Sequence, residues 1–508
     1  MNTTTRNPAA SVGIPSRALR TLVTLVALAA AVVGSALLAT ILVPHDTARS
    51  LADALALDGS VDGFTVERWN RLQRFGAASG VVVLLLAFAT FWQRRRLAAA
   101  AARASGSLRR SLRLLAADTA AGIGHIGRRH LLALAALTAA ALALRLTLLF
   151  EPIRYDEAFT VRYFAAKPFH VALTDYSAPN NHLLHTALVR IVYLLLGPEP
   201  WAIRLPALAA GLALIPLVYA ATRLFAGRRA AIAAAALLAV SPQMVLYSVN
   251  ARGYTLMCMF FLLLVLLGHY WARTGSAAAL VLSVLAATAG LYAIPIMLFP
   301  LGAIALWLLA PWFAAGSFHE WWRTRRTLLL AGAATAGLTT LLYLPVIIVN
   351  GWDALVANPA VVPLPWNEFL TRFPPLVANT WRMWHSGVPL PGRLALGVAA
   401  AIGLAACFRP HRRELRFLLV GAVLWSLLIL AIQQRSPAPR GWIFLLPLYL
   451  VVIATGLAAA GERLAARLRT APALLVGAPA LALALLSLPG STRNARQLVV
   501  TDPSTYAD

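Results

Sequence analysis

The chain has few acidic residues and a single lysine. Its 508 residues include 18 Asp and Glu against 44 Lys and Arg, which gives a formal net charge of +26 at pH 7. Charged residues make up only 12% of the chain and hydrophobic residues 60%, whereas a soluble globular domain has about 45–50% apolar residues. This composition excludes a soluble globular protein, and it relates the positive charge to a membrane rather than to a nucleic-acid partner.

Several chemical motifs are also missing. The two cysteines, Cys258 and Cys407, fall in apolar runs near opposite membrane faces, so we expect no disulfide between them. The sequence has no glycine-rich phosphate loop, no His-x-x-x-His pair and no nucleophile elbow. Chemistry driven by ATP or a nucleotide sugar on the cytoplasmic side would need a soluble nucleotide-binding domain, for which the sequence offers no candidate segment. A lipid-linked donor is therefore favoured.

Long apolar runs are the main feature that is present. A membrane-spanning helix needs about 20 predominantly apolar residues, and such runs recur with short polar breaks from residue 18 to residue 489. We predict an all-α polytopic membrane protein with about 11–13 transmembrane helices.

Arginine-rich breaks set the predicted orientation. The break at residues 93–130 is expected in the cytoplasm, because short loops rich in Lys and Arg stay there. The helix at 131–150 then runs outward and delivers Asp156 and Glu157 to the extracytoplasmic face. Counting onward, segments 350–393 and 435–441 are expected on the same outer side.

In the region after the acidic pair, the apolar runs do not alternate between the two sides of the membrane as simple counting requires. Three apolar runs, at 182–196, 201–221 and 230–246, would put Asn250 inside, whereas the downstream loops require it outside. Prolines between residues 198 and 206 indicate where a crossing is lost, because proline favours a break or a re-entrant segment. We expect one net crossing between 182 and 221.

Four segments follow from this organisation: an N-terminal transmembrane hairpin at 1–93, a cytoplasmic basic linker at 94–130, a transmembrane core at 131–489 and an extracytoplasmic tail at 490–508. The first apolar run exceeds the roughly 7–15 residues of the apolar region of a signal peptide, which favours a retained anchor. Within the linker, leucines and arginines are spaced either as an interfacial helix on anionic lipid or as a plain topogenic charge run.

Ionisable residues gather at the outer end of the core. Asp156 and Glu157 directly follow an apolar run, where acids cost desolvation energy unless they face water, a partner or a substrate. Lys167, the single lysine, follows on the side where positive charge is disfavoured. It is either a phosphate contact or a solvated loop charge. Arg252 lies between two apolar spans, where its guanidinium suits a phosphate, a carboxylate or an ion pair with the acidic residues.

Four segments together resemble the GT-C glycosyltransferases of the family 39 type, relatives of protein O-mannosyltransferases and of the lipid A aminoarabinose transferase. They read RYDEAFT, APNNHLLHTALVRI, WAIRLPALAAG and SPQMVLYSVNARGYTL, and the similarity covers roughly residues 131–460. The resemblance implies a GT-C helical bundle with an extracytoplasmic active-site loop and a catalytic core. It implies transfer of a sugar from a polyprenyl-phosphate carrier to an outer acceptor, normally with inversion, and it maps the catalytic base onto Asp156, with Glu157 beside it.

The chemistry of such a transfer needs the same residue types. A carboxylate must deprotonate the acceptor hydroxyl, and cations must stabilise the phosphate leaving group. The predicted catalytic residues are Asp156 and Glu157; the predicted phosphate-binding residues are Lys167, Arg252, Arg435 and Arg440; and the predicted substrate-binding residues are Tyr155, Asn181, His182, Asn250, Tyr254 and Tyr292. For His182 the alternative is a capping or packing role, and for the tyrosines a place in the interfacial belt.

Asn250 stands where many relatives carry an acid, which weakens the case for a metal ion held by two separated carboxylates. We therefore predict no cofactor and no metal ligands. The alternative function is a transporter or flippase for lipid-linked sugars, which would carry ionisable residues deep in several spans. The expected partners are a polyprenyl-phosphate sugar, a lipid, protein or glycan acceptor, and membrane lipids. The Ala- and Arg-rich composition suggests the plasma (inner) membrane of a bacterium.

Overall fold

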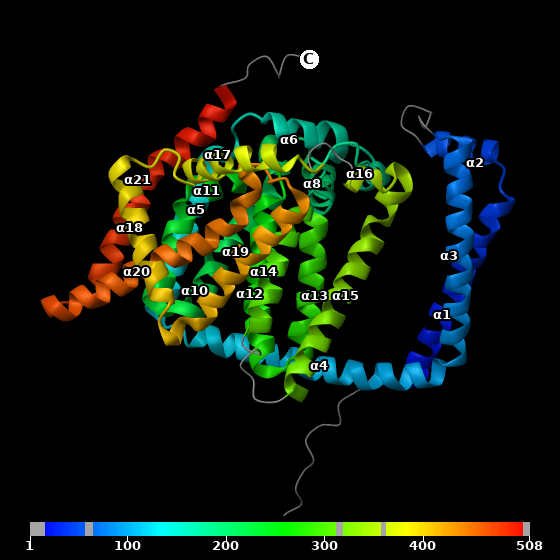
Figure 1. Ribbon diagram of the computed structural model, residues 1–508, viewed down its shortest axis with the longest axis horizontal. Coiled ribbons are helices and arrows are strands. Elements are labelled where there is room, and N and C mark those ends of the chain that lie inside the picture. Colours follow the sequence, from blue (N-terminus) through cyan, green and yellow to red (C-terminus); the bar gives the residue numbers. More distant parts are fainter. Residues whose placement is uncertain (1–15, 56–63, 311–317, 357–361, 501–508) are drawn as a thin grey trace, which may run out of the picture. The chain divides into compact units, whose positions relative to one another are not determined.

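The structure, a computed structural model, describes residues 16–55, 64–310, 318–356 and 362–500 (Figure 1). Every regular element within these residues is a helix, which confirms the all-α prediction. The end of the predicted tail, residues 501–508, lies outside the described residues. The chain divides into two compact units, residues 1–118 and 119–508, and each is described by itself.

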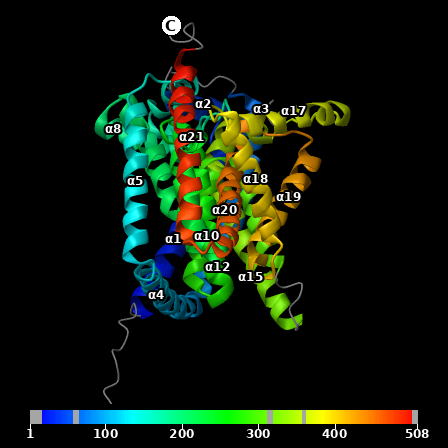
Figure 2. The same cartoon turned by 90° about the vertical axis from the view of Figure 1, so that its left-hand side faces the viewer.

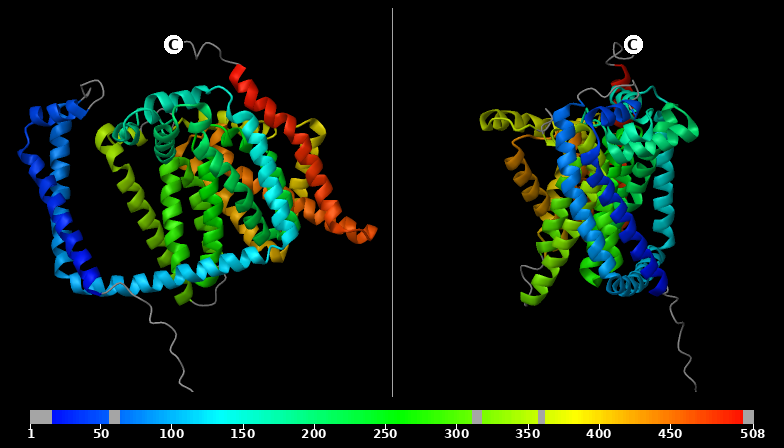
Figure 3. Two further views of the ribbon diagram at one scale, coloured as in Figure 1. Left: turned by 180° about the vertical axis from the view of Figure 1, so that it is seen from behind. Right: turned by 90° about the vertical axis from the view of Figure 1, so that its right-hand side faces the viewer.

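The first unit contains the two apolar helices expected of the hairpin. Its elements are α1 (Ser16–Ala39), α2 (His45–Leu55), α3 (Val66–Trp92) and most of α4 (Arg94–Gly124). Helices α1 and α3 run side by side (Figure 3). A Cβ atom added at Gly80 would lie 2.7 Å from the carbonyl oxygen of Gly34. Small residues therefore allow the two backbones to approach closely, as in many membrane helix pairs.

The second unit is a bundle of long helices. They are α5 (Arg128–Leu149), α10 (Leu205–Val240), α12 (Tyr254–Thr274), α13 (Ala277–Ala293), α14 (Leu298–Leu309), α15 (Phe318–Asn350), α18 (Leu390–Cys407), α19 (Arg413–Gln433), α20 (Leu445–Leu468) and α21 (Pro472–Val500). Figure 2 shows α5, α18 and α21 extending along the bundle. Over both units, nine helices of the described residues are long and apolar enough to cross a membrane, and four shorter apolar helices accompany them. The predicted number of about 11–13 transmembrane helices lies between the nine long helices alone and the total obtained when the four shorter helices are added.

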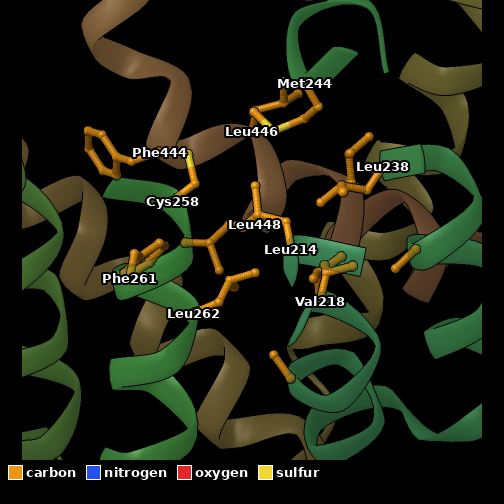
Figure 4. Close-up of a cluster of buried hydrophobic side chains, with 14 of the residues drawn as sticks. Leu214, Val218, Leu238, Met244, Cys258, Phe261, Leu262, Phe444, Leu446 and Leu448 are labelled. Carbon is orange, nitrogen blue, oxygen red and sulfur yellow. The ribbon is translucent and has the colours of Figure 1, made fainter. Parts of the chain in front are cut away.

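The core of the bundle lies where α10, α12 and α20 meet. Figure 4 shows Leu214, Phe261 and Leu448 converging there, one from each helix, and all three are buried. Helix α20 also touches α18 at very close range. A Cβ atom added at Gly403 would lie 1.9 Å from the carbonyl oxygen of Val452, so only glycine fits. Helices that are apolar on all sides are expected at such a central position.

One end of the bundle is built from short helices and turns (Figure 1). They are α6 (Tyr155–Thr160), α7 (Phe169–Thr174), α8 (Leu183–Leu196), α9 (Pro200–Ile203), α11 (Pro242–Ser248), α16 (Asp353–Val356), α17 (Trp366–Trp384) and the 3-10 helix Pro439–Phe444. Asn350, at the end of α15, accepts a hydrogen bond from the backbone N–H of Tyr176 at 3.2 Å. The segments predicted to share one face of the membrane therefore do lie at one end of the bundle.

Helix α8 accounts for the membrane crossing that is missing between residues 182 and 221. Its 14 residues span about 21 Å, less than the hydrocarbon core of about 30 Å. Before α8, the imidazole of His182 accepts a hydrogen bond from the N–H of Gly253 at 2.9 Å. After it, Arg204 forms an ion pair with Glu157, whose carboxylate also accepts from the N–H of Ala251 at 2.7 Å. Both ends of α8 thus lie at the same end of the bundle, and the single net crossing belongs to α10, as predicted.

Helix α10 turns back at Gly227, whose backbone is not helical (φ 84°, ψ 178°). Arg223 and Arg228 flank this turn. Their guanidinium groups donate hydrogen bonds to the carbonyl oxygens of Gly122 and His125, at 3.2 and 2.7 Å. These acceptors precede α5, at the opposite end of that helix from the acidic pair. The positive charge near Gly227 and the acidic pair therefore belong to opposite ends of the bundle.

Candidate active site

The acidic pair occupies the first turn of α6. The backbone N–H of Arg154, the residue before this helix, donates to the Oε2 atom of Glu157 at 3.0 Å. Carboxylates are favoured at a helix N-terminus, where backbone N–H groups are unpaired and the helix dipole is positive. Successive residues of a helix point about 100° apart. Asp156 and Glu157 consequently face different surroundings.

Glu157 is completely buried and fully engaged. Its Oε1 accepts from Nε of Arg204 at 2.8 Å and from the N–H of Ala251 at 2.7 Å. Its Oε2 accepts from Nη2 of Arg204 at 2.8 Å in addition to the N–H of Arg154. Arg204 is also fully buried, and it donates to the carbonyl oxygens of Leu149, Glu151 and Pro152, which precede α6. This bidentate pair therefore holds α6, α9 and the segment after α11 together.

The surroundings of Glu157 keep it ionised. Burial alone would raise the pKa of this carboxyl group. The hydrogen bonds and charge of Arg204, the charge of Arg154 and the N–H of Ala251 outweigh burial and lower the pKa below its usual value. A carboxylate whose lone pairs are occupied by protein donors is poorly placed to take a proton from a substrate.

Asp156 is the accessible member of the pair. Its side chain is 32% exposed, and its Oδ2 accepts a hydrogen bond from Nη1 of Arg440 at 3.1 Å. Arg440 lies in the 3-10 helix that begins α20 and is itself 45% exposed. The structure thus joins the predicted base to one of the predicted phosphate-binding arginines.

Arg252 reaches the same helix from the second cluster. It is buried, and its Nη1 donates to the hydroxyl of Thr160 at 3.3 Å and to the carbonyl oxygen of Asn180 at 3.4 Å. The Thr160 hydroxyl in turn donates to the carbonyl oxygen of Asp156 at 3.0 Å. Among the described residues Arg252 has no ion pair with Asp156 or Glu157. The structural ion pair considered for Arg252 is therefore not formed among the described residues, and its role in ligand binding stays a prediction.

His182 is held as a neutral imidazole. Its Nδ1 accepts the N–H of Gly253, which leaves the proton on Nε2 in the neutral form. Burial, followed by the charges of Arg252, His185 and Arg440, lowers the pKa of His182 well below its usual value. His182 precedes α8 but makes no capping hydrogen bond through its side chain. At neutral pH its Nε2–H is a hydrogen-bond donor.

Two tyrosines and an asparagine complete this side of the site. Tyr254 is buried and packs edge-on against His182, with 5.3 Å between ring centroids. The ring of Tyr247 lies 4.8 Å from that of Tyr254. Asn250 is buried, and its Oδ1 has no hydrogen-bond partner among the described residues. The predicted residues Tyr254 and Asn250 are thus brought to the site, and Tyr254 does not lie in an interfacial belt.

Two other predicted substrate-binding residues are used by the fold. The side-chain amide of Asn181 donates to the carbonyl oxygens of Ala172 and Asp175, at 2.9 and 2.7 Å, and accepts from the hydroxyl of Thr186 at 2.7 Å. Tyr292 packs edge-on against Tyr343 at 5.6 Å between centroids. The side chain of Asn181 therefore stabilises the loop after α7, and Tyr292 packs against α15.

The remaining predicted residues differ in their surroundings. Lys167 is half-buried, and its ammonium group has no hydrogen bond or ion pair with the described residues. Arg435 donates to the carbonyl oxygen of Val362 at 3.1 Å, so it is tied to the segment before α17. Tyr155 is 59% exposed at the start of α6. Of these residues, Lys167 is the cation whose side-chain donors all remain available to a ligand.

The sequence interpretation did not assign roles to Arg204, Thr160 and His185. Arg204 lies in the WAIRLPALAAG segment, where a lone arginine between apolar residues was the available signal. His185 is fully buried, and both of its ring nitrogens lack hydrogen-bond partners among the described residues. Nothing in the sequence distinguishes it from a packing histidine.

The described residues contain no group of three or more His, Cys, Asp and Glu side chains that could hold a metal ion. The acidic side of the site consists of Asp156, paired with Arg440, and Glu157, paired with Arg204. Independence of a cofactor and of a metal remains a prediction.

Comparison with known proteins bears on the fold and family. Residues 179–352 match the model of the dolichyl-phosphate-mannose-protein mannosyltransferase family. No curated protein sequence matches the chain. The crystal structure of ArnT from Cupriavidus metallidurans bound to undecaprenyl phosphate is similar, with a TM-score of 0.50, 16% identity, and coverage of 72% of this chain and 77% of ArnT. The chain has the GT-C glycosyltransferase fold.

Two further solved structures with this fold are similar at lower scores. Apo ArnT from Cupriavidus metallidurans has a TM-score of 0.45 at 17% identity, covering 72% of this chain and 74% of ArnT. The Archaeoglobus fulgidus oligosaccharyltransferase in complex with Zn and sulfate has a TM-score of 0.47 at 15% identity, covering 71% of this chain and 53% of that protein. The resemblance to GT-C glycosyltransferases is confirmed for the fold, and the mannosyltransferase family model matches part of the chain, residues 179–352.

Proposed function

We propose that this GT-C protein transfers a sugar from a polyprenyl-phosphate carrier to a hydroxyl group of an acceptor, with Asp156 as the general base. One observation carries the proposal: of the two adjacent acids, Glu157 is saturated with protein donors, whereas the carboxylate of Asp156 is accessible. A carboxylate placed to take the acceptor proton is the group that an inverting transfer requires.

The cations of the site suit the leaving group. Transfer leaves negative charge on the carrier phosphate, and cations aimed at this charge lower the barrier. Arg440 and Arg252 lie next to α6, and Lys167 follows α6 and the turn Val161–Ala165 with its ammonium group unpaired among the described residues. The ArnT structure that shares the fold holds undecaprenyl phosphate, which supports a carrier of this chemistry.

The proposed base has two states, one in which Asp156 is paired with Arg440 and one in which it is not. A pair this exposed contributes about 0–1 kcal/mol, whereas an arginine–phosphate contact is charge-assisted and bidentate. A bound carrier phosphate therefore competes successfully for Arg440. The release of Arg440 frees Oδ2 of Asp156, so a bound donor increases the fraction of the base that is available to the acceptor hydroxyl.

His182 and Asn250 are proposed to orient the sugar. The Nε2–H of His182 is a neutral donor, and Oδ1 of Asn250 is a buried acceptor without a partner among the described residues. A sugar hydroxyl can satisfy both kinds of group, because it donates and accepts. The end of the bundle that carries the site is proposed to face away from the cytoplasm, since Arg223 and Arg228 belong to the other end. The proposed location is the bacterial plasma membrane.

The test is transfer of labelled sugar from a panel of polyprenyl-phosphate sugars to endogenous acceptors in membrane vesicles. Vesicles carry the native chain, Asp156→Asn or Asp175→Asn, in which the same chemical change affects an acid whose Oδ1 accepts the N–H of Ser177. We expect Asp156→Asn to lower the transfer rate about 10²–10⁴-fold at unchanged protein level and without weakening donor binding. Asp175→Asn should transfer at the native rate.

Equal rates for the native chain and Asp156→Asn would remove Asp156 from catalysis. Absence of labelling with every donor, together with movement of the carrier across the bilayer, would favour the transporter instead. The anomeric configuration of the product separates inversion from retention.

A further inference from the structure

A pocket lies outside the group of residues around Asp156. Its cavity of about 610 Å³ is lined by the end of α17, the loop between α17 and α18, the start of α18 and two leucines of α21. Ligand pockets of proteins measure about 300–1,000 Å³. The cavity is therefore large enough for the headgroup of a lipid and part of a chain.

Two arginines dominate the charge of this pocket. Arg382 lies in the last turn of α17 and Arg393 in the first turn of α18, and both are exposed. Neither has a hydrogen bond or an ion pair with the described residues through its side chain. No carboxylate is among the residues that line the pocket. Its net charge is consequently positive, and the cations keep their bonding capacity for a ligand.

The loop between the arginines is held in one conformation. Gly387 has φ 73°, the left-handed region that disfavours other residues. The Nδ1–H of His385 donates to the carbonyl oxygen of Trp381 at 2.9 Å, and its Nε2 lies 3.0 Å from the hydroxyl of Tyr449, which donates to it in this tautomer. Burial and the charge of Arg393 lower the pKa of His385, against the raising effect of the Trp381 carbonyl. The loop between Arg382 and Arg393 is thus held in one conformation, and its His385 side chain is neutral.

The opposite wall is apolar. Leu485 and Leu486 of α21 line the pocket and are 55% and 40% exposed, and Val388 and Pro389 continue the apolar surface. A small inorganic anion would gain no favourable contact from this apolar wall. An amphiphile with an anionic headgroup matches both sides of the pocket.

We propose that this pocket binds the phosphate headgroup of an anionic membrane lipid between Arg382 and Arg393, with the lipid chain against Leu485 and Leu486. This lipid site is separate from the Asp156 site, because the two share no lining residue. It does not depend on the proposed transfer activity.

The experiment measures equilibrium binding of labelled short-chain phosphatidylglycerol to the purified full-length protein in detergent, with phosphatidylcholine and inorganic phosphate as the other ligands. Attraction of about 1 kcal/mol per cation predicts about fivefold weaker binding of phosphatidylglycerol for Arg382→Ala or Arg393→Ala, and about thirtyfold for the double variant. The matched control is Arg372→Ala, also on α17, because Arg372 forms an ion pair with Glu368 and does not line the pocket. It should bind like the native chain.

A fourth variant separates a lipid from a free anion. Leu485→Ser removes apolar wall at an exposed position and should weaken phosphatidylglycerol binding while leaving any phosphate binding unchanged. Equal binding by the native chain and the double arginine variant overturns the proposal. Inorganic phosphate binding as tightly as phosphatidylglycerol overturns the lipid assignment. Asp156→Asn should bind phosphatidylglycerol normally, so failure of the transfer proposal leaves this measurement intact.

Discussion

Asp156 and Arg440 are 284 positions apart in the sequence, and Nη1 of Arg440 donates to Oδ2 of Asp156 at 3.1 Å. The contact joins the helix that follows α5 to the turn that begins α20. It brings a base candidate and a phosphate-binding candidate together. The function of each residue can therefore be tested through the other.

Replacement of Arg440 should impair use of the donor. Arg440→Ala removes a charged hydrogen-bonding group worth about 1.5–3 kcal/mol, so kcat/KM for the donor should fall about ten- to a hundredfold. Arg435→Ala serves as the comparison, because Arg435 is tied to the carbonyl oxygen of Val362, and its effect should be small. Steady-state transfer kinetics in vesicles measure both. A native donor kcat/KM for Arg440→Ala would exclude the proposed phosphate contact.

Amide substitution of the two adjacent acids should change the stability of the protein by very different amounts. Glu157→Gln leaves the buried Arg204 charge without a charged partner and should destabilise the protein by about 3–5 kcal/mol. Asp156→Asn removes an exposed pair worth about 0–1 kcal/mol. Thermal unfolding of the two purified variants in detergent measures the difference. Similar unfolding temperatures would contradict the structural role of Glu157.

The stabilising effect of Glu157 should depend on pH. Its pKa is lower in the folded protein than its ordinary value of 4.5, so its contribution is complete above that value and is lost as the pH falls through the folded-state pKa. The stability difference between the native chain and Glu157→Gln should therefore be constant near neutral pH and shrink below about pH 4. Unfolding measured from pH 7 down to pH 3 tests this. A difference that grows on acidification would mean that the pKa of Glu157 is raised.

Lys167 should act on donor binding through its charge. Lys167→Ala should raise KM for the donor, whereas Lys167→Arg should retain most of the affinity, because either cation attracts a phosphate. Stability should not change, since the ammonium group has no partner among the described residues. Donor titration of both variants measures the effect. An unchanged KM for Lys167→Ala would support the solvated-loop interpretation.

Transfer should continue after metal removal. The prediction follows from Asn250, an uncharged residue in the second cluster, and from the pairing of both acids of the site with arginines. Vesicles treated with EDTA should transfer sugar at the native rate, and added Mg²⁺ or Mn²⁺ should not increase it. Loss of transfer that is restored by one of these ions would show a metal requirement.

The class of fold follows from the amino-acid sequence alone. Apolar runs of about 20 residues can satisfy their backbone hydrogen bonds in a membrane only as helices, so periodicity and length were sufficient. The arginine distribution also placed residues 154–160, 247–254 and 435–441 on a common side, and these segments do meet. Recognition of the GT-C type followed from motifs that the fold confirms.

The surroundings of each residue of the site depend on how the chain packs. Asp156 and Glu157 are indistinguishable in the sequence, and their roles separate because α6 turns one of them toward Arg204 and leaves the other accessible. Asn181 was predicted to bind substrate from its place in the sequence, and only the structure shows that its side chain is hydrogen-bonded to two backbone carbonyls and a hydroxyl of the folded loop. The local sequence shows which chemical groups are present. Their protonation and availability depend on burial and on partners brought from distant segments, which only packing determines.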